Sequence, residues 1–470
     1  MLRILLTILL TAGTLLAQQA PQHETALGGE FRLEGDRFHD SCVQFSIASC
    51  ADLLFTDHPL HIAVGSIAPQ NGFGSGLALV THSDFKTWLF KSDTDVIGTA
   101  NGSWRVGTYM KIIPTTAPKI QPHISTGQQP EQPLKSHLRV LDRPLFTIYA
   151  QAISLTKLDF FGLGPGTSQA GRSFFGMRET ITGGNAIVPI PMSNKLNLSF
   201  LGEMNGRFVS IRGDRDESSP SIEQLYTPVT APGLATQPGF IQFGEGLRMK
   251  PVLFAGYLRL NYLANLQQFV APSNSSFSFR RFTADLSHQV PLYRTTVPSP
   301  KDANGPDECG TDDKSLTCPS IKSISRNRYG TLDFRFLLSE SIASSGSVVP
   351  FYFDPTLGGA DINGSASLSS YQDYRFRGPD VMLFHAGLEH SIFSTPVGFI
   401  FGADAGKVAL TRGELGLDHL SHSFSTGLTL RAGGFPQVFL LFAWGGQEGT
   451  HTIGSLNTSL LGGSIRPSLY

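Results

Sequence analysis

The sequence is short of charge, of tryptophan and of long apolar runs. Only 16% of its 470 residues are charged, against about 25% in an average soluble domain. It has 3 Trp but 34 Phe and 50 Gly, and this composition suits a chain whose outer surface meets lipid. The formal net charge of −1 argues against nucleic acid as the main partner, because nucleic-acid binding needs concentrated positive charge.

One long apolar run opens the chain. Arg3 precedes an apolar stretch over residues 4–16, and the small residue Ala17 follows it. This order predicts a cleavable signal peptide at residues 1–17, and hence an exported protein. An uncleaved membrane anchor is the alternative, but a helix needs about 20 apolar residues to cross a bilayer. Later apolar stretches are interrupted by polar residues such as Arg259, so no transmembrane helix is expected in the mature chain.

Cysteine is also scarce. The four cysteines form two local pairs, Cys42 with Cys50 and Cys309 with Cys318. In an exported protein, this spacing predicts two disulfides that close short loops. Neither pair is C-x-x-C and no histidine cluster accompanies them, so we expect no metal site.

Two glycine-rich segments are candidates for a nucleotide site. Residues 72–76 read GFGSG and residues 160–168 read FFGLGPGTS. Neither stands between a strand and a helix with an acidic residue about 20 positions later, as a dinucleotide fingerprint requires. They predict tight turns at strand ends, and we expect no cofactor.

Polar and apolar residues alternate along much of the chain. The clearest cases are residues 258–267 and 332–339, where every second residue is apolar. This period of two is typical of strands with two different faces. Similar shorter patterns begin at Lys195 and occur near residues 75–84, 103–112, 145–154, 277–288, 383–391, 397–405, 426–431 and 438–444.

Chain length separates two all-β architectures. A soluble β-sandwich also alternates, but residues 61–470 show strand and turn patterns with no convincing amphipathic helix. A transmembrane strand takes about 10 residues, and at roughly 25 residues per strand and connection the segment holds about 16 strands. We therefore predict a transmembrane antiparallel β-barrel at 61–470, preceded by a short periplasmic segment at 18–60.

Three long polar inserts interrupt the alternating pattern. They cover residues 115–137, 213–239 and 298–327, and they are rich in Pro, Ser, Gly and charge. They are too long for hairpin turns. We expect them to be outer loops of the barrel.

Residues 357–408 read LGGADINGSASLSSYQDYRFRGPDVMLFHAGLEHSIFSTPVGFIFGADAGKV. This block resembles the bacterial surface antigen superfamily, sixteen-stranded outer-membrane barrels that include the barrel-assembly insertase and the two-partner secretion transporters. One family motif, G/F-x-D-x-G on a strand, matches Gly402, Asp404 and Gly406. The resemblance implies that a long loop folds into the lumen near this aspartate.

The family's second motif, [VIL]-R-G-[FY] at the loop tip, falls on residues 368–371, which read LSSY. The family's arginine and glycine are both serine here, before Tyr371. Arg375 and Arg377 follow within the loop, ahead of Gly378. Either arginine is expected to reach Asp404 and form a bidentate lock, and the alternative is that both are solvated.

The resemblance implies an outer-membrane protein that inserts or translocates polypeptide or lipid, without catalysis. It also implies a weak seam between the first and last strands, near 75–84 and 460–470. The family's POTRA repeats do not fit into residues 18–60, so we expect outer-membrane lipid and a separate POTRA-bearing or other periplasmic protein as partners. The alternatives are a passive porin-like channel and a lipid hydrolase that uses Ser421 with the histidines at 419 and 422.

Overall fold

The computed structural model describes residues 60–85, 87–114, 144–191, 196–213, 220–254, 258–292, 330–392, 395–432 and 435–456, together with Arg32, Asp36 and His39. The predicted signal peptide, nearly all of segment 18–60 and all four cysteines lie outside these residues. The two predicted disulfides therefore stay predictions. In the described ranges, none of the helices combines the length and the apolar character that crossing a membrane requires.

The described chain is almost entirely β-structure. Its strands are β1 (Leu60–Ser66), β2 (Phe73–Phe85), β3 (Trp88–Thr99), β4 (Trp104–Pro114), β5 (Leu145–Phe160), β6 (Ser173–Pro189), β7 (Leu198–Gly213), β8 (Phe240–Met249), β9 (Val252–Leu253), β10 (Leu258–Val270), β11 (Phe279–Pro291), β12 (Gly330–Ala343), β13 (Thr356–Leu357), β14 (Phe376–Arg377), β15 (Asp380–Ser391), β16 (Val397–Ala409), β17 (Ser421–Ala432), β18 (Phe435–Gly446) and β19 (Gly449–Leu456). The helical elements are single turns: η2 (Gln169–Gly171), α4 (Ile222–Leu225), η5 (Ser275–Phe277), η6 (Phe351–Phe353) and η7 (Arg412–Glu414).

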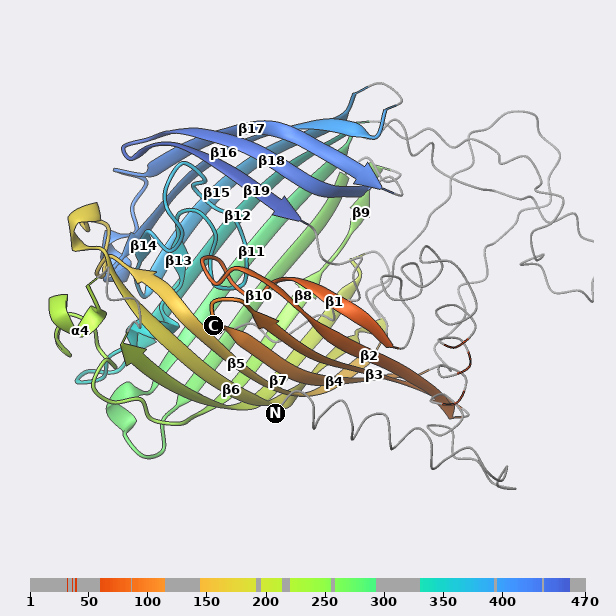
Figure 1. Ribbon diagram of the computed structural model, residues 1–470, viewed down its shortest axis with the longest axis horizontal. Coiled ribbons are helices and arrows are strands. Elements are labelled where there is room, and N and C mark those ends of the chain that lie inside the picture. Colours follow the sequence, from red (N-terminus) through yellow and green to blue (C-terminus); the bar gives the residue numbers. More distant parts are fainter. Residues whose placement is uncertain are drawn as a thin grey trace, which may run out of the picture.

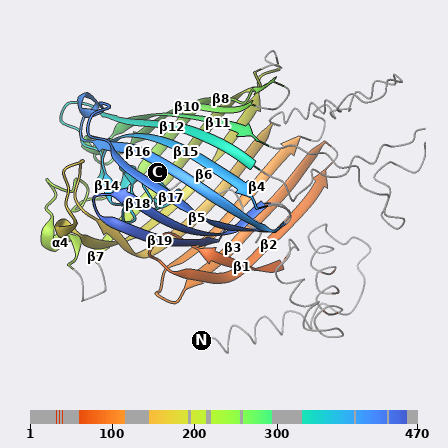
Figure 2. The same cartoon turned by 90° about the horizontal axis from the view of Figure 1, so that it is seen from above.

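The long strands form one antiparallel sheet in which each strand pairs with its neighbour in the chain. The two-residue strand β9 also pairs with β10. Without β9, the sheet consists of sixteen strands from β1 to β19. Figures 1 and 2 show the sheet curling around an interior, with β19 turning back toward β1. No register between β19 and β1 is present among the described residues. The predicted sixteen-stranded all-β architecture is confirmed.

The two faces of the sheet differ in polarity, as β7 illustrates. Met204 and Phe208 point outward and are each 59% exposed, whereas Asn205 and Arg207 point inward and are 2% and 1% exposed. Successive side chains of a strand lie on opposite faces, so the charged set is enclosed and the apolar set covers the outside. A soluble sandwich has the opposite arrangement. An apolar exterior around a polar interior is typical of transmembrane barrels.

Ion pairs line the interior of the first strands. Arg207 Nη1 lies 3.2 Å from Glu179 Oε1, and both side chains are 1% exposed. Arg105 Nη2 lies 2.9 Å from Asp95 Oδ2. Pairing is what makes buried charge tolerable, because an unpaired buried ion loses its hydration without compensation.

The ends of the strands correct one expectation about the polar inserts. In an antiparallel meander, connections alternate between the two ends of the sheet. The insert at 213–239 joins β7 to β8, at the end where α4 and β14 lie in Figure 1. The inserts at 115–137 and 298–327 join β4 to β5 and β11 to β12, which end at the opposite side. The prediction that all three are outer loops is therefore wrong.

Candidate functional site

The connection between β12 and β15 folds into the interior of the sheet and is called the plug loop here (residues 344–379). It contains η6 and the two-stranded pair of β13 with β14, where Thr356 lies opposite Arg377. Figure 1 shows these elements inside one end of the curled sheet. The predicted lumen-inserted loop is confirmed.

Glycines let the plug loop turn back on itself. Gly358 and Gly359 adopt φ angles of +100° and +57°, the left-handed region that glycine enters without steric cost. A Cβ at Gly358 would lie 2.6 Å from the Cβ of Arg375. A larger residue at this position would therefore push apart the two arms of the loop.

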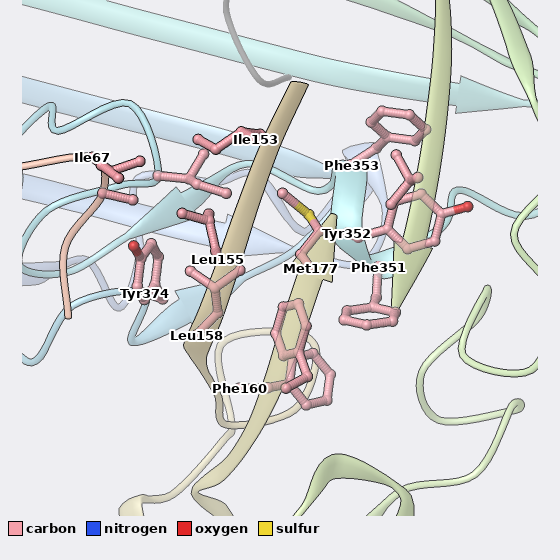
Figure 3. Packing of buried hydrophobic residues seen from close by; sticks show 14 of the residues in the cluster. Ile67, Ile153, Leu155, Leu158, Phe160, Met177, Phe351, Tyr352, Phe353 and Tyr374 are labelled. Carbon is pink, nitrogen blue, oxygen red and sulfur yellow. The ribbon is translucent and has the colours of Figure 1, made fainter. Parts of the chain in front are cut away.

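Aromatic side chains anchor the base of the plug loop. Phe351 and Phe353 are 0% and 1% exposed. The ring of Phe351 makes edge contacts with Phe160 and Phe175, each at a centroid distance of 5.1 Å, and Phe353 packs on Phe240 at 4.9 Å. Figure 3 shows Phe351 and Phe353 of η6 in the same cluster as Phe160 of the barrel wall. Burying one such ring contributes about 2–3 kcal/mol, so the base of the plug loop is part of the main apolar core.

Two arginines bind the carbonyl groups of this aromatic turn. Arg377 Nη1 donates to the carbonyl oxygens of Phe351 and Asp354, at 3.0 and 3.3 Å. Arg281 of β11 donates to the carbonyl oxygen of Phe353 at 2.7 Å. Burial raises the pKa of Asp354 to about 8, and the charges of Arg281 and Arg377 oppose this rise.

Arg375 links three separate parts of the barrel. Its guanidinium forms an ion pair with Glu448, in the turn between β18 and β19. It also donates to the hydroxyl and carbonyl oxygens of Thr167, at 2.8 and 2.7 Å, in the connection between β5 and β6. The rings of Phe161 and Phe376 flank it at 5.0 and 4.7 Å. Because its side chain is 5% exposed, these contacts form in a largely desolvated environment.

Asp404 has a different partner from the one expected. Its Oδ1 lies 2.6 Å from Nδ1 of His385 on β15, and Nε2 of the same histidine lies 3.2 Å from Asp333 of β12. The register places His385 directly opposite Asp404. The expectation that Arg375 or Arg377 binds Asp404 is therefore wrong. Arg375 extends toward Glu448 and Arg377 toward the carbonyl groups of η6. His385 of the wall binds Asp404 in their place.

The tip of the plug loop nevertheless reaches the strand motif. The backbone N–H of Ser370 donates to Ser423 Oγ at 2.8 Å, and Ser423 lies opposite Asp404 in the pairing of β16 with β17. Tyr371 packs against Gly446, where a Cβ would approach its ring to 2.7 Å. Residues 368–371, which the motif comparison assigned to the loop tip, thus contact the strand beside Asp404 through a serine and not through an arginine.

The backbone on either side of the tip is strained. Leu368 and Tyr374 have φ angles of +45° and +59°, and such conformations cost about 1–3 kcal/mol per residue. Both side chains are almost fully buried, and the hydroxyl of Tyr374 donates to the carbonyl oxygen of Pro69 at 3.2 Å. Packing therefore holds the tip in a conformation that the free chain avoids.

The remaining motif residues have positions that follow from the strands. Gly402 and Gly406 are on the interior face of β16, where a Cβ at Gly406 would lie 3.0 Å from Leu357 of the plug loop. At Gly378, a Cβ would lie 2.8 Å from the carbonyl oxygen of Ala409. Gly406 and Gly378 thus permit close approach of the plug loop to the wall, whereas a Cβ at Gly402 would lie 2.7 Å from Ser425 Oγ of the neighbouring strand β17.

Two further candidate sites from the sequence, the glycine-rich segment 160–168 and the pair Ser421 and His422, lie in a turn and in a wall strand. Gly162 and Gly164 have φ angles of +98° and +91°, in agreement with a turn after β5. Ser421 and His422 are consecutive in β17, so their side chains point to opposite faces of the sheet. This placement does not bring them together as a catalytic dyad.

Three residues of the site were not predicted from the sequence: Glu448, His385 and Asp333. His385 had a visible signal, since it occupies an inward position of the alternating segment at 383–391. Glu448 had none, because it stands in the two-residue turn between β18 and β19.

Comparisons with known proteins gave structural matches alone. No family model matches the sequence, and no curated protein matches it. Among solved structures, CdiB from Acinetobacter baumannii is 10% identical to this chain, with a TM-score of 0.46. The match covers 84% of this chain and 58% of that protein. CdiB from Escherichia coli is 10% identical with a TM-score of 0.47, for 82% of this chain and 58% of that one.

A third structure, BamA from Haemophilus ducreyi lacking POTRA domains 1–3, is 9% identical with a TM-score of 0.47, for 84% of this chain and 69% of that one. The chain spans 58% of the length of either CdiB protein.

Proposed function

We propose that this protein is an outer-membrane β-barrel that inserts or translocates polypeptide or lipid, and that the plug loop keeps it closed at rest. The apolar exterior supports the membrane location. The proposal includes no catalysis. A separate periplasmic protein, POTRA-bearing or of another kind, would present the substrate.

One observation carries the proposal: the plug loop is bonded to both outer parts of the sheet. Tyr374 binds Pro69, between β1 and β2, and the adjacent Arg375 binds Glu448, between β18 and β19. These contacts connect the two edges through the plug loop, in a sheet whose described residues include no closing register. Release of the plug loop would therefore free the lumen and loosen the edges together.

A passive porin is the alternative, and the density of plug contacts argues against it. A steady channel needs a water-filled path, whereas Arg375 and Arg377 are each 4% exposed inside the barrel. Arg375 forms a buried ion pair with Glu448, and removing one partner of a buried ion pair costs about 3–5 kcal/mol. The plug loop would thus stay closed until a substrate or partner supplies comparable free energy.

Single-channel recording in planar bilayers tests the proposal. Glu448→Gln leaves Arg375 without its carboxylate and should raise the open probability by at least about a hundredfold. Arg412→Ala is the matched control, because its pair with Glu340 has an arginine side chain that is 80% exposed. Steady, equal conductance in the wild type and both variants would instead establish the porin.

A further inference from the structure

The outward face of the sheet carries a groove that the plug loop does not explain. The groove has a volume of about 810 Å³ and crosses β4 to β8 and β10. Its walls include Phe146, Ile148, Met204 and Phe243, all between 37% and 59% exposed. These residues share the outward parity of their strands, so the groove lies on the exterior and not in the lumen.

Small residues form the floor of the groove. The strand registers align Phe146 with Ala186, Ala186 with Gly202, and Gly202 with Glu245. At Gly202 an added Cβ would meet just one ring carbon of Phe200, at 3.6 Å. The floor is therefore open, and the aromatic and aliphatic walls rise around it.

The groove carries one outward charge. Glu245 is exposed beside Gly202, and no ion pair or hydrogen bond of Glu245 occurs among the described residues. The other carboxylate in the lining, Glu203, accepts hydrogen bonds from Tyr149 at 2.9 Å and from Asn205 at 3.0 Å, on the inward side. No basic residue lines the groove. A carboxylate facing a membrane without a partner is unfavourable, so the groove is complementary to a cation attached to an apolar body.

We propose that this groove binds an amine-bearing phospholipid such as phosphatidylethanolamine. Its acyl chains would lie over the Gly202 floor, and its ammonium group would pair with Glu245. Gln268, next to Phe243 in the register, offers an amide to the ester or phosphate oxygens. An anionic lipid would be repelled by Glu245, and a quaternary ammonium headgroup has no N–H to donate.

Native mass spectrometry of the full-length barrel tests this inference, which rests on the proposed membrane location. The protein is extracted from vesicles with equal parts of phosphatidylethanolamine, phosphatidylcholine and phosphatidylglycerol, after heat-modifiability confirms insertion. The wild type should retain phosphatidylethanolamine about tenfold over the other two lipids, the effect of one charge-assisted hydrogen bond. Failure to insert would overturn the membrane location as well, whereas insertion without this preference overturns the lipid site alone.

Three variants separate the parts of the site. Gly202→Phe fills the floor and should abolish lipid retention, while Glu245→Gln, which is isosteric, should remove the preference for the amine. Gly206→Phe is the control, because Gly206 is outward on the same strand, lies outside the groove and has its nearest neighbour at 3.7 Å. Unchanged phosphatidylethanolamine retention in Glu245→Gln, or a polypeptide found in the groove, would overturn the proposal.

Discussion

Replacing Asp354 by Asn should weaken the pH dependence of barrel closure. The carboxyl group is buried beneath η6, and burial raises its pKa to about 8 from an ordinary value of 3.8. The closed state therefore favours the protonated form. Once the plug loop is released into water, the carboxyl group ionises near its ordinary pKa.

The sign and size follow from proton linkage. Between about pH 4 and 8 the released plug loop binds fewer protons than the docked one, so closure weakens as pH rises. Each pH unit in this window costs about 1.4 kcal/mol, which gives about 4 kcal/mol between pH 5 and 8. The ratio of open to closed barrels should then increase about a thousandfold over this range.

Single-channel open probability measured from pH 5 to 8 is the assay. The wild type should open progressively as pH rises, and Asp354→Asn should open to a much smaller extent, because burial also raises the pKa of Asp361 and Asp373 in the plug loop. Asp418→Asn is the control, since this side chain is 66% exposed and its change should leave the pH response intact. Parallel pH responses in the wild type and Asp354→Asn would refute the assignment of the effect to this carboxyl group.

Three further changes test the packing and the charge pairs. Phe353→Ala should cost about 3–5 kcal/mol and lower the temperature at which the folded band disappears on gels, whereas Phe401→Ala, at an outward site that is 41% exposed, should have a much smaller effect. Glu179→Gln should cost about 3–5 kcal/mol in urea unfolding, because it strands buried Arg207, and an unchanged midpoint would contradict the interior pairing. His385→Ala should cost about 1–3 kcal/mol by leaving Asp404 and Asp333 without a donor, and His385→Gln should recover part of that loss in the same unfolding assay.

The sequence predicted those strands whose apolar residues alternate clearly. It missed β3, in which Asp93 and Asp95 occupy inward positions, because their cationic partners Lys111 and Arg105 belong to the next strand. It also missed β6, where glycine and threonine weaken the apolar pattern. In a barrel with a polar interior, the inward residues are not apolar, so they do not add to the hydrophobic pattern. Their partners on the next strand can be identified only once the register is known.

The contacts of the candidate site could not be predicted from the sequence. The motif comparison placed residues 368–371 near Asp404, and Ser370 does contact the strand beside it. The partner of Asp404 depends on the register of β15 with β16, which places His385 opposite it. The partner of Arg375 depends on a turn far along the chain, at Glu448. Pairings of this kind arise from strand register and from contacts between distant parts of the chain, and not from local sequence.

Deletion of the plug loop tests the central claim most directly. β12 and β15 are paired neighbours, so a short glycine-serine turn can replace residues 345–378 without separating the strands. The wild-type barrel should remain closed in planar bilayers, and the deleted form should conduct steadily. Equal conductance of the two proteins would contradict the account that the plug loop closes this barrel.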